Sequence, residues 1–342
     1  MNRLFAAACG ILLASIATTL PARAWDYEGH RTVNQLALAS LPTNFPAFTR
    51  VPTSVERIAF LSGEPDRWRN TSDVPLRHFN GPDHYFDVED VGFAKLDPKD
   101  LSHFRYVFVA QFAAARAANP TNFPPFDPAT DRDHVKTWPG FLPWAITENY
   151  AKLKSGFSYL KVFEELGTPE EIANAQQNIL YLMGVLGHYV GDAAQPLHTT
   201  RHFNGWVGEN PKGYSTKPTF HAWVDGGFLA KHGGAKVADL QPKLRPARML
   251  WAGEPRAKHE DVFPEAMAYI LDQFKLMEPL YQMDKDGKLS GEGEAAQEGR
   301  AFLTGQLVKA GQMLGDLYFS AWQQAAPDVF LKTQLNKRKL AQ

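Results

Sequence analysis

Residues 168–196 read TPEEIANAQQNILYLMGVLGHYVGDAAQP and carry the clearest helical signal in the chain. The segment opens with Thr168 as a helix cap, a proline at the first helical position and Glu171 placed to complete a capping box. Apolar residues then recur at the spacing of one helical face, namely Ile172, Ile179, Leu182, Leu186 and Val190. Pro196 cannot continue this pattern. The segment therefore predicts one long helix that ends just before Pro196.

Other segments share this helical periodicity, whereas the alternating pattern of strands is scarce. We expect helices over residues 30–41, which Pro42 terminates, and over residues 262–282 and 295–325. The segment 90–143 is rich in proline, phenylalanine and aspartate, and we expect long ordered loops there, with one helix over about 106–118. The sequence thus predicts an all-α fold, a single mainly helical domain with long ordered loops.

The composition is that of a packed protein, with 342 residues of which 44% are hydrophobic and 21% charged. A formal net charge of −1 excludes a protein that holds nucleic acid mainly through a large excess of basic residues. Any polyanionic substrate must therefore be bound by a local group of side chains.

The first 24 residues have the pattern of a secretory signal peptide. A basic start leads into an apolar run, and small residues near its end place the cleavage between Ala24 and Trp25. The predicted organisation is therefore a signal peptide, 1–24, followed by one domain, 25–342. Cys9 is the only cysteine and lies in the leader. We expect an exported protein, secreted or periplasmic, without disulfides and without integral membrane association, because no other segment approaches ~18 uninterrupted apolar residues.

Histidine and aspartate recur at spacings typical of metal ligands. His188 and Asp192 lie four residues apart on the predicted long helix, so their side chains project from one face. Taken alone, this pair is read as an ion pair or a satisfied core histidine. However, further groupings occur along the chain: His198, then His221 with Asp225, and, before them, Asp66 with His84 and Asp87. Imidazole and carboxylate are the ligands of zinc when cysteine is absent, so the clusters together favour a metal site.

Trp25 gives an independent indication of metal binding. Cleavage before Trp25 leaves a free α-amino group with a pKa of roughly 8. That nitrogen and the carbonyl oxygen of the same residue can close a five-membered chelate around a metal ion, and His30 follows five residues later. The alternative is that Trp25 is an ordinary buried aromatic residue near the new terminus.

These residues resemble, in identity and order, the zinc phosphoesterases of the nuclease S-one/P-one and phospholipase C superfamily. The resemblance covers essentially all of 25–342. It is most specific between His188 and His198, where Asp192 and the ending Pro196-Leu197-His198 follow the family pattern. The other matching segments are Trp25-Asp26-Tyr27-Glu28-Gly29-His30, Asp66-Arg67-Trp68-Arg69, His84-Tyr85-Phe86-Asp87 and His221-Ala222-Trp223-Val224-Asp225.

The resemblance implies a helical fold of the phospholipase C and zinc nuclease type with three zinc ions. The ligands that it implies for the first ion are Asp66, His84, His188 and Asp192. For the second ion they are His198, His221 and Asp225. The third ion would take the amino nitrogen and carbonyl oxygen of Trp25 together with His30, and Asp192 would bridge it to the first.

The resemblance also implies the reaction. Hydrolysis of a phosphodiester would use a hydroxide shared by two zinc ions as the nucleophile, with the third ion near the leaving oxygen. By the pattern of the nucleases, Arg69 would clamp the phosphate, while Tyr85 and Asp87 would hold a base by stacking and hydrogen bonding. Core packing remains an alternative for Tyr85, as does a contact to a ligand histidine for Asp87.

We therefore expect a secreted endonuclease that cleaves single-stranded DNA or RNA to products with a 5′-phosphate, because a base stacked on Tyr85 must be unstacked from its neighbours. A phospholipase C acting on phospholipid is the alternative within the family, although those enzymes have glutamate where Asp225 stands. A non-catalytic secreted zinc-binding helical protein is the alternative outside it. We expect a monomer. The remaining histidines are interpreted as surface or packing residues: His78, His103, His134, His202, His232 and His259.

Overall fold

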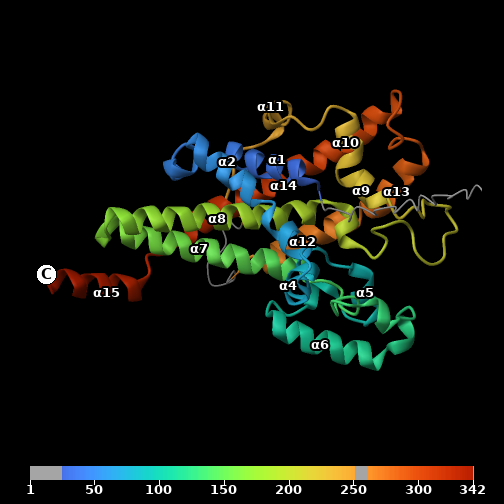
Figure 1. The fold of residues 1–342 in the computed structure, drawn as a ribbon, viewed down its shortest axis with the longest axis horizontal. Coiled ribbons are helices and arrows are strands. Elements are labelled where there is room, and N and C mark those ends of the chain that lie inside the picture. The colour runs from blue at the N-terminus through green and yellow to red at the C-terminus, as the bar shows by residue number, and fades with distance from the viewer. Residues whose placement is uncertain (1–24, 251–260, 342) are drawn as a thin grey trace, which may run out of the picture.

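Two long antiparallel helices, α7 (Leu142–Leu166) and α8 (Pro169–Ala194), form the centre of the computed structural model (Figure 1). The structure describes residues 25–250 and 261–341. The turn between the two helices ends at Thr168, whose side chain accepts a hydrogen bond from the Glu171 backbone N–H while the Glu171 carboxylate accepts one from the Thr168 N–H. The capping box predicted from the sequence is therefore present.

Three further helices pack against α8 and complete the bundle: α1 (Tyr27–Ser40), α2 (Pro52–Leu61) and α14 (Ala295–Gln324). The hydroxyl of Tyr318 on α14 lies within hydrogen-bond distance of two acceptors, the side-chain oxygen of Asn34 on α1 at 2.8 Å and the carbonyl oxygen of Met183 on α8 at 2.6 Å. A Cβ atom at Gly311 of α14 would lie 2.5 Å from the Cβ of Leu36 on α1. Glycine at this position therefore lets α1 and α14 approach closely.

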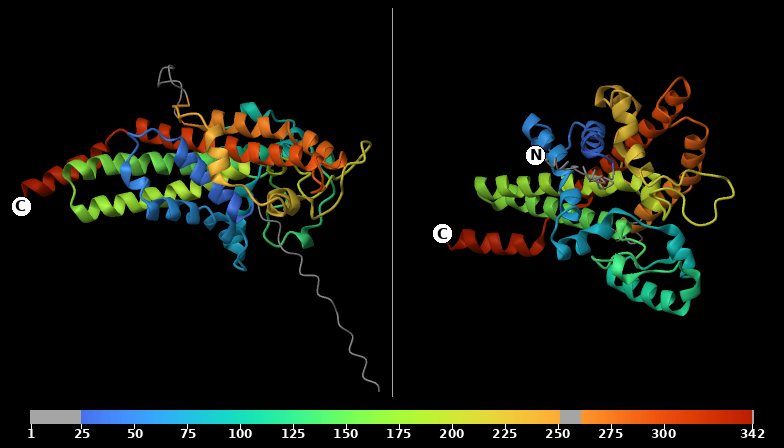
Figure 2. Two further views of the ribbon diagram at one scale, coloured as in Figure 1. Left: turned by 90° about the horizontal axis from the view of Figure 1, so that it is seen from above. Right: turned by 45° about the vertical axis from the view of Figure 1, so that its right-hand side comes forward.

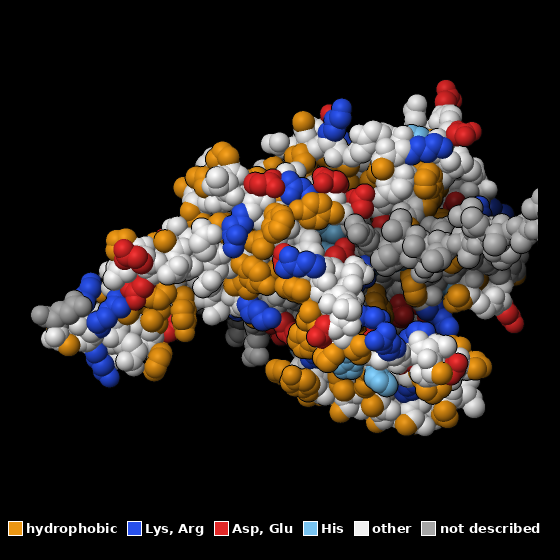
Figure 3. Space-filling model, viewed as in Figure 1, with side chains coloured by type: hydrophobic (Ala, Val, Ile, Leu, Met, Phe, Trp, Pro, Cys, Tyr) orange, Lys and Arg blue, Asp and Glu red, His pale blue; other side chains and the backbone are white. Residues whose placement is uncertain are grey.

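Shorter helices connect and flank the bundle. They are α3 (Glu64–Arg69), α4 (Val74–Asn80), α5 (Val88–Phe93), α6 (Arg105–Ala118), α9 (Phe220–Ala222), α10 (Phe228–Lys231), α11 (Val237–Leu240), α12 (Phe263–Phe274), α13 (Met277–Lys285) and α15 (Val329–Leu340). Figure 2 shows α6 and its loops at one side of the bundle, while α15 continues past the ends of α7 and α8. Figure 3, in the same view as Figure 1, shows hydrophobic and basic side chains gathered over the part that carries α4 and α6.

The all-α prediction is confirmed: about 68% of the described residues are helical, and none of them lies in a strand. The helices predicted over 30–41, 106–118, 168–196 and 295–325 correspond to α1, α6, α8 and α14. Among the described residues, no helix is long and apolar enough to cross a membrane. The predicted signal peptide, 1–24, and Cys9 lie outside the described residues.

The prediction of a single helix over 262–282 is wrong. The chain forms two helices there, α12 and α13, with a break after Phe274. The backbone N–H of Leu276 bonds to the carbonyl oxygen of Gln273 at 2.8 Å, three residues back, which tightens the turn and redirects the chain. Apolar residues on both sides of the break kept the same periodicity, so the sequence pattern did not reveal it.

Candidate metal centre

Eight buried or nearly buried side chains from separate elements meet beside the C-terminal half of α8. Two come from α8 itself, His188 and Asp192. The others are His30 of α1, Asp66 of α3, His84 of the 3-10 turn Gly81–His84, His198 of the 3-10 turn Pro196–Thr199, His221 of α9 and Asp225 of the π-helical turn Trp223–Gly227. The structure thus brings together every histidine and aspartate that the sequence analysis assigned to metal binding.

The first group joins Asp66, His84 and His188, whose ligand atoms lie within 4.8 Å of one another. The Nδ1 atom of His84 lies 2.9 Å from the Nε2 atom of His188. The Oδ1 atom of Asp66 lies 3.9 Å from His188 Nε2 and 4.0 Å from His84 Nδ1. Two imidazole nitrogens and a carboxylate oxygen therefore face one point.

The second group joins His198, His221 and Asp225. The Nε2 atoms of His198 and His221 lie 3.0 Å apart, and His221 Nε2 lies 2.9 Å from Asp225 Oδ2. The other carboxylate oxygen of Asp225 accepts a hydrogen bond of 2.5 Å from Gln195 Nε2. This bond holds the carboxylate in place and leaves Oδ2 directed at the two rings.

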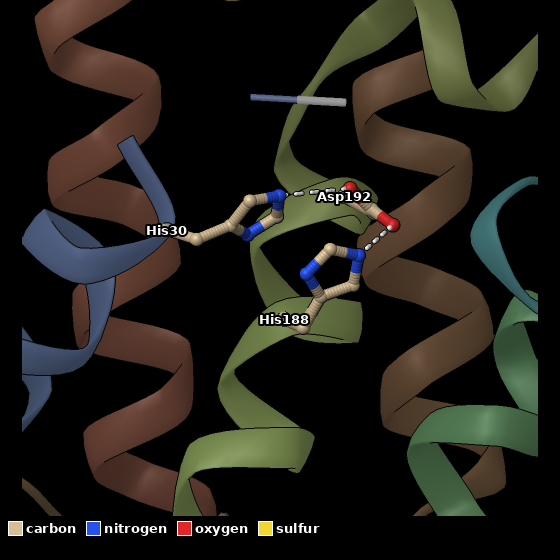
Figure 4. A group of neighbouring side chains, drawn as sticks. All are labelled: His30, His188 and Asp192. Atoms are coloured by element: carbon tan, nitrogen blue, oxygen red, sulfur yellow. Dashed lines mark ion pairs between the residues drawn. The ribbon is translucent and has the colours of Figure 1, made fainter. Parts of the chain in front are cut away.

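The third group joins His30, His188 and Asp192, and Figure 4 shows the two rings turned toward opposite oxygens of the aspartate. His30 Nε2 lies 3.4 Å from Asp192 Oδ1, and His188 Nε2 lies 3.2 Å from Asp192 Oδ2. The rings of His30 and His188 stack with centroids 3.9 Å apart. Asp192 also contacts the other groups, because its Oδ2 lies 2.9 Å from His84 Nδ1 and its Oδ1 lies 3.8 Å from His198 Nδ1.

Backbone carbonyl groups orient two of the rings. His188 Nδ1 donates a hydrogen bond of 2.7 Å to the carbonyl oxygen of Ser62, and His198 Nδ1 donates one of 2.6 Å to that of His84. A proton on Nδ1 leaves the Nε2 lone pair free to bind a metal ion, and metal-binding histidines are oriented in this way. Both Nε2 atoms point into the groups described above.

Several buried polar atoms of these groups lack a hydrogen-bond partner. They are His30 Nδ1 and Nε2, His84 Nε2, Asp192 Oδ1, His221 Nδ1 and Asp225 Oδ2. Buried polar atoms in folded proteins are nearly always satisfied, so a concentration of exceptions at one place calls for a missing partner. A cation in the second or third group would satisfy the atoms that face it, namely Asp225 Oδ2 in the second and His30 Nε2 and Asp192 Oδ1 in the third, which means that the residues present fit a metal centre.

Burial sets the protonation states that ligands need. It lowers the pKa of His30 to about 3, that of His84 to about 4 and that of His221 to about 3, so these imidazoles are neutral. Burial alone would raise the pKa of Asp192, but the surrounding histidines hold it well below its usual range. Burial raises the pKa of Asp225 well above its usual range, so a nearby cation is needed to keep that carboxylate ionised.

Trp25 lies beside this centre. Its side chain is fully buried, and its indole Nε1 donates a hydrogen bond of 2.9 Å to the carbonyl oxygen of Gly191. The next backbone N–H, of Asp26, donates to the carbonyl oxygen of Asp225 at 3.2 Å. The start of the predicted mature chain is therefore fixed next to two of the candidate ligands, as a buried tryptophan with a specific hydrogen bond.

A pocket of about 380 Å³ opens beside the second group and is lined by His198 and His221. The three residues assigned to substrate from the sequence, Arg69, Tyr85 and Asp87, also line it. Arg69 Nε lies 2.9 Å from Asp66 Oδ1. In the described part of the chain, no hydrogen bond joins the Asp87 carboxylate to a candidate ligand histidine, which argues against the alternative role considered for Asp87.

No sequence pattern indicated the other residues that line this pocket, which are Val135, Lys136, Trp138, Leu197 and Phe203. Three of them come from the segment 90–143, for which the sequence predicted long loops outside one helix over about 106–118. No spacing rule identifies such residues. The part of the segment that carries them forms no regular helix, and backbone hydrogen bonds hold it against the chain near Tyr85.

The remaining histidines lie outside the three groups. His78 and His134 are exposed, His103 stacks on Phe263, and His202 stacks on Trp206, as expected of surface and packing residues. His259 lies outside the described residues.

Comparison with protein-family models and with curated proteins finds no match to this chain. The features of the molecule that indicate a function are therefore the three groups that could hold metal ions and the pocket beside them.

Proposed function

We propose that the protein is a zinc-dependent phosphodiesterase that cleaves single-stranded nucleic acid and leaves 5′-phosphate ends. One observation carries this proposal: the pocket that exposes His198 and His221 also carries a guanidinium, an aromatic ring and a carboxylate, from Arg69, Tyr85 and Asp87. A phosphodiester next to a base presents groups that match all three.

Zinc is the metal that the ligand chemistry favours. The three groups contain only imidazole and carboxylate, and these are the zinc ligands of sites without cysteine. Asp66, His84, His188 and Asp192 would hold one ion, and His198, His221 and Asp225 a second. His30 and Asp192, with the amino nitrogen and carbonyl oxygen of Trp25, would hold a third. Zinc ions at these residues would supply a nucleophile at neutral pH and neutralise phosphate charge.

Arg69 would bind the phosphate. Its ion pair with Asp66 holds the guanidinium at the wall of the pocket, and its side chain is only 16% exposed. A planar guanidinium donates parallel hydrogen bonds to two phosphate oxygens, which fixes the orientation of the group as well as its position.

Tyr85 and Asp87 would hold the base. The two residues lie two positions apart in the sequence, and both line the pocket. Asp87 is the N-cap residue that precedes α5, so its backbone is fixed. An aromatic ring can stack on a base while a carboxylate accepts hydrogen bonds from the base edge. A base held in this way cannot also be stacked in a duplex, which supports a single-stranded substrate.

Export is part of the proposal. Removal of residues 1–24 would free the amino group of Trp25. The proposed third zinc site, which includes this amine, would therefore be complete only after cleavage. The mature chain would then act as a monomer, secreted or in a periplasm, and the net charge of the chain leaves substrate binding to the pocket and not to a general basic surface.

A side-by-side assay of the mature chain, 25–342, tests the proposal. Bound metals are measured, and hydrolysis of single-stranded DNA, single-stranded RNA, duplex DNA and phosphatidylcholine is compared after zinc loading. We expect zinc at about three ions per chain and hydrolysis of the single strands well above that of the duplex. Hydrolysis of phosphatidylcholine alone would establish a phospholipase C. Retention of zinc without hydrolysis of any substrate would establish a metal-binding protein.

A further inference from the structure

The pocket beside the metal centre has two basic side chains in its lining, and they differ in their partners. Arg69 is paired with Asp66. Lys136, by contrast, has no carboxylate oxygen within 4.0 Å among the described residues, and its ammonium group donates only to the hydroxyl of Thr130, at 3.1 Å. The side chain is exposed, so the charge is available to an anion that enters the pocket.

The backbone that carries Lys136 is held firmly in place. The Oδ1 atom of Asp131, a buried residue, accepts hydrogen bonds from the N–H groups of Val135 and Lys136, at 2.9 and 3.2 Å. These bonds close the loop just before the pocket wall. Lys136 therefore has a fixed backbone position although its side chain is exposed.

The next residues attach this loop to the base-binding side of the pocket. The carbonyl oxygen of Pro139 accepts a hydrogen bond of 2.6 Å from the N–H of Asp87, and the carbonyl oxygen of Tyr85 accepts one of 3.2 Å from that of Leu142. Gly140 has a φ of +93°, and a Cβ there would collide with the Tyr85 carbonyl oxygen. The segment is thus pressed against 82–87 and places Lys136 in the same pocket as Tyr85 and Asp87.

We propose that Lys136 binds a second phosphate of the substrate, on the nucleotide next to the phosphate that is cleaved. This inference rests on the proposed function and makes it narrower. Arg69 would hold the phosphate at the metal centre, the base would lie against Tyr85 and Asp87, and the neighbouring phosphate would reach Lys136. A pocket of about 380 Å³ is in the range that encloses one small ligand, such as a single nucleotide between two phosphates. The preferred substrate is then a chain with at least two phosphates.

Three dinucleotides test this assignment: one with only its internucleotide phosphate, one with an added 5′-terminal phosphate and one with an added 3′-terminal phosphate. Cleavage of the internucleotide bond is followed for wild type, Lys136→Gln, Lys136→Arg and Lys309→Gln, where Lys309 is an exposed lysine of α14. For wild type we expect the added phosphate, at one end, to raise kcat/KM about fivefold, the size of one exposed ionic contact. Lys136→Gln should bring this ratio near one, whereas Lys136→Arg and Lys309→Gln should preserve it.

Salt dependence provides a second measurement. On a longer single strand, Lys136→Gln should reduce the slope of log(1/KM) against log[salt] by about 0.7, the value for one phosphate contact on a single strand. An unchanged ratio in Lys136→Gln, or no gain from either added phosphate in wild type, would overturn the role of Lys136 while leaving the nuclease intact. Failure of the zinc-loaded wild type to cleave any of these substrates would overturn the proposed function itself.

Discussion

The indole of Trp25 and the backbone of Gly191 are joined by a buried hydrogen bond of 2.9 Å. Gly191 precedes Asp192, the carboxylate that contacts all three groups of candidate ligands. The bond fixes the first residue of the predicted mature chain beside that carboxylate. The tryptophan side chain is fully buried next to α8, and its own backbone lies near the candidate ligands.

An extended N-terminus should impair the third metal site. If Ala24 is kept before Trp25, the amino group of Trp25 becomes part of an amide, which does not bind a metal ion as an amine does. We expect the extended chain to lose about one zinc ion per molecule and most of its phosphodiesterase activity. Metal analysis and an assay on single-stranded DNA measure both effects.

Trp25→Phe with the native terminus is the matched control. It removes the bond to Gly191 but keeps the amine, so it should lower thermal stability more than it lowers zinc content. Equal zinc content and turnover in the extended and native chains would show that the amine of Trp25 is not a ligand.

Removal of the metal ions should destabilise the protein. The variant Asp225→Asn should distinguish stability that comes from metal binding at this carboxylate from stability of the metal-free fold. In the absence of a cation, burial raises the pKa of Asp225, so a neutral amide is tolerated there and can still accept the hydrogen bond from Gln195. We expect wild type and Asp225→Asn to melt at similar temperatures after chelation. Zinc at about 100 times its Kd should stabilise wild type by about 2.7 kcal/mol per site, with a smaller gain for the variant. An identical gain in the two proteins would exclude Asp225 as a ligand.

Tyr85 should contribute to substrate binding through its ring. Base stacking on an aromatic side chain contributes about 1–3 kcal/mol, so Tyr85→Ala should raise KM for single-stranded DNA by about tenfold or more. Tyr85→Phe keeps the ring and should stay close to wild type. Melting temperatures of both variants check that the fold is intact. A similar loss in Tyr85→Phe and Tyr85→Ala would indicate that the hydroxyl, and not the stacking surface, is what matters.

Replacing either of two glycines of α14 by alanine should change the stability of the protein in opposite directions. At Gly311 a new Cβ would lie 2.5 Å from the Cβ of Leu36, so Gly311→Ala should push α1 and α14 apart and cost about 1–3 kcal/mol. At Gly305, in the same helix, a Cβ would meet no atom within 4 Å, so Gly305→Ala should add about 0.5–1 kcal/mol by reducing backbone entropy. Urea denaturation of both variants measures the difference. Similar changes in the two would contradict the proposed close approach of the helices.

The helices that the sequence predicted are those with one apolar stripe, and α8 is the clearest example because caps mark its start and Pro196 its end. The helix α7 was missed for the opposite reason. Residues 142–147 are all buried, so this part of the helix has apolar or small residues on every side and shows no stripe. Hydrophobic periodicity reveals a helix that has one face on the core and one face in solvent. It does not reveal a helix that is buried on all sides.

For the candidate site, spacing along the chain indicated which residues could bind metal. The four-residue pairs His188 with Asp192 and His221 with Asp225 follow from helical geometry, and the structure places their ligand atoms 3.2 and 2.9 Å apart. By contrast, Lys136 lies more than 40 residues from any of these ligands, in a loop held by Asp131. Its place in the pocket depends on tertiary contacts, which no local pattern encodes.

His202 should make the stability of the protein depend on pH. Burial lowers its pKa to about 4, its ring stacks on Trp206, and its Nδ1 accepts a hydrogen bond of 3.1 Å from the N–H of Val207, so the folded protein holds the neutral ring. The unfolded chain takes up a proton below about pH 6.5, the ordinary pKa of histidine. The stability that depends on the neutral ring is therefore complete above pH 6.5 and is lost as the pH falls toward 4.

His202→Asn keeps an acceptor for Val207 but does not titrate, so the difference in free energy of unfolding between wild type and this variant should shrink between pH 7 and pH 4. Urea denaturation across this range measures the difference, and a value independent of pH would show that His202 is not held neutral by the fold.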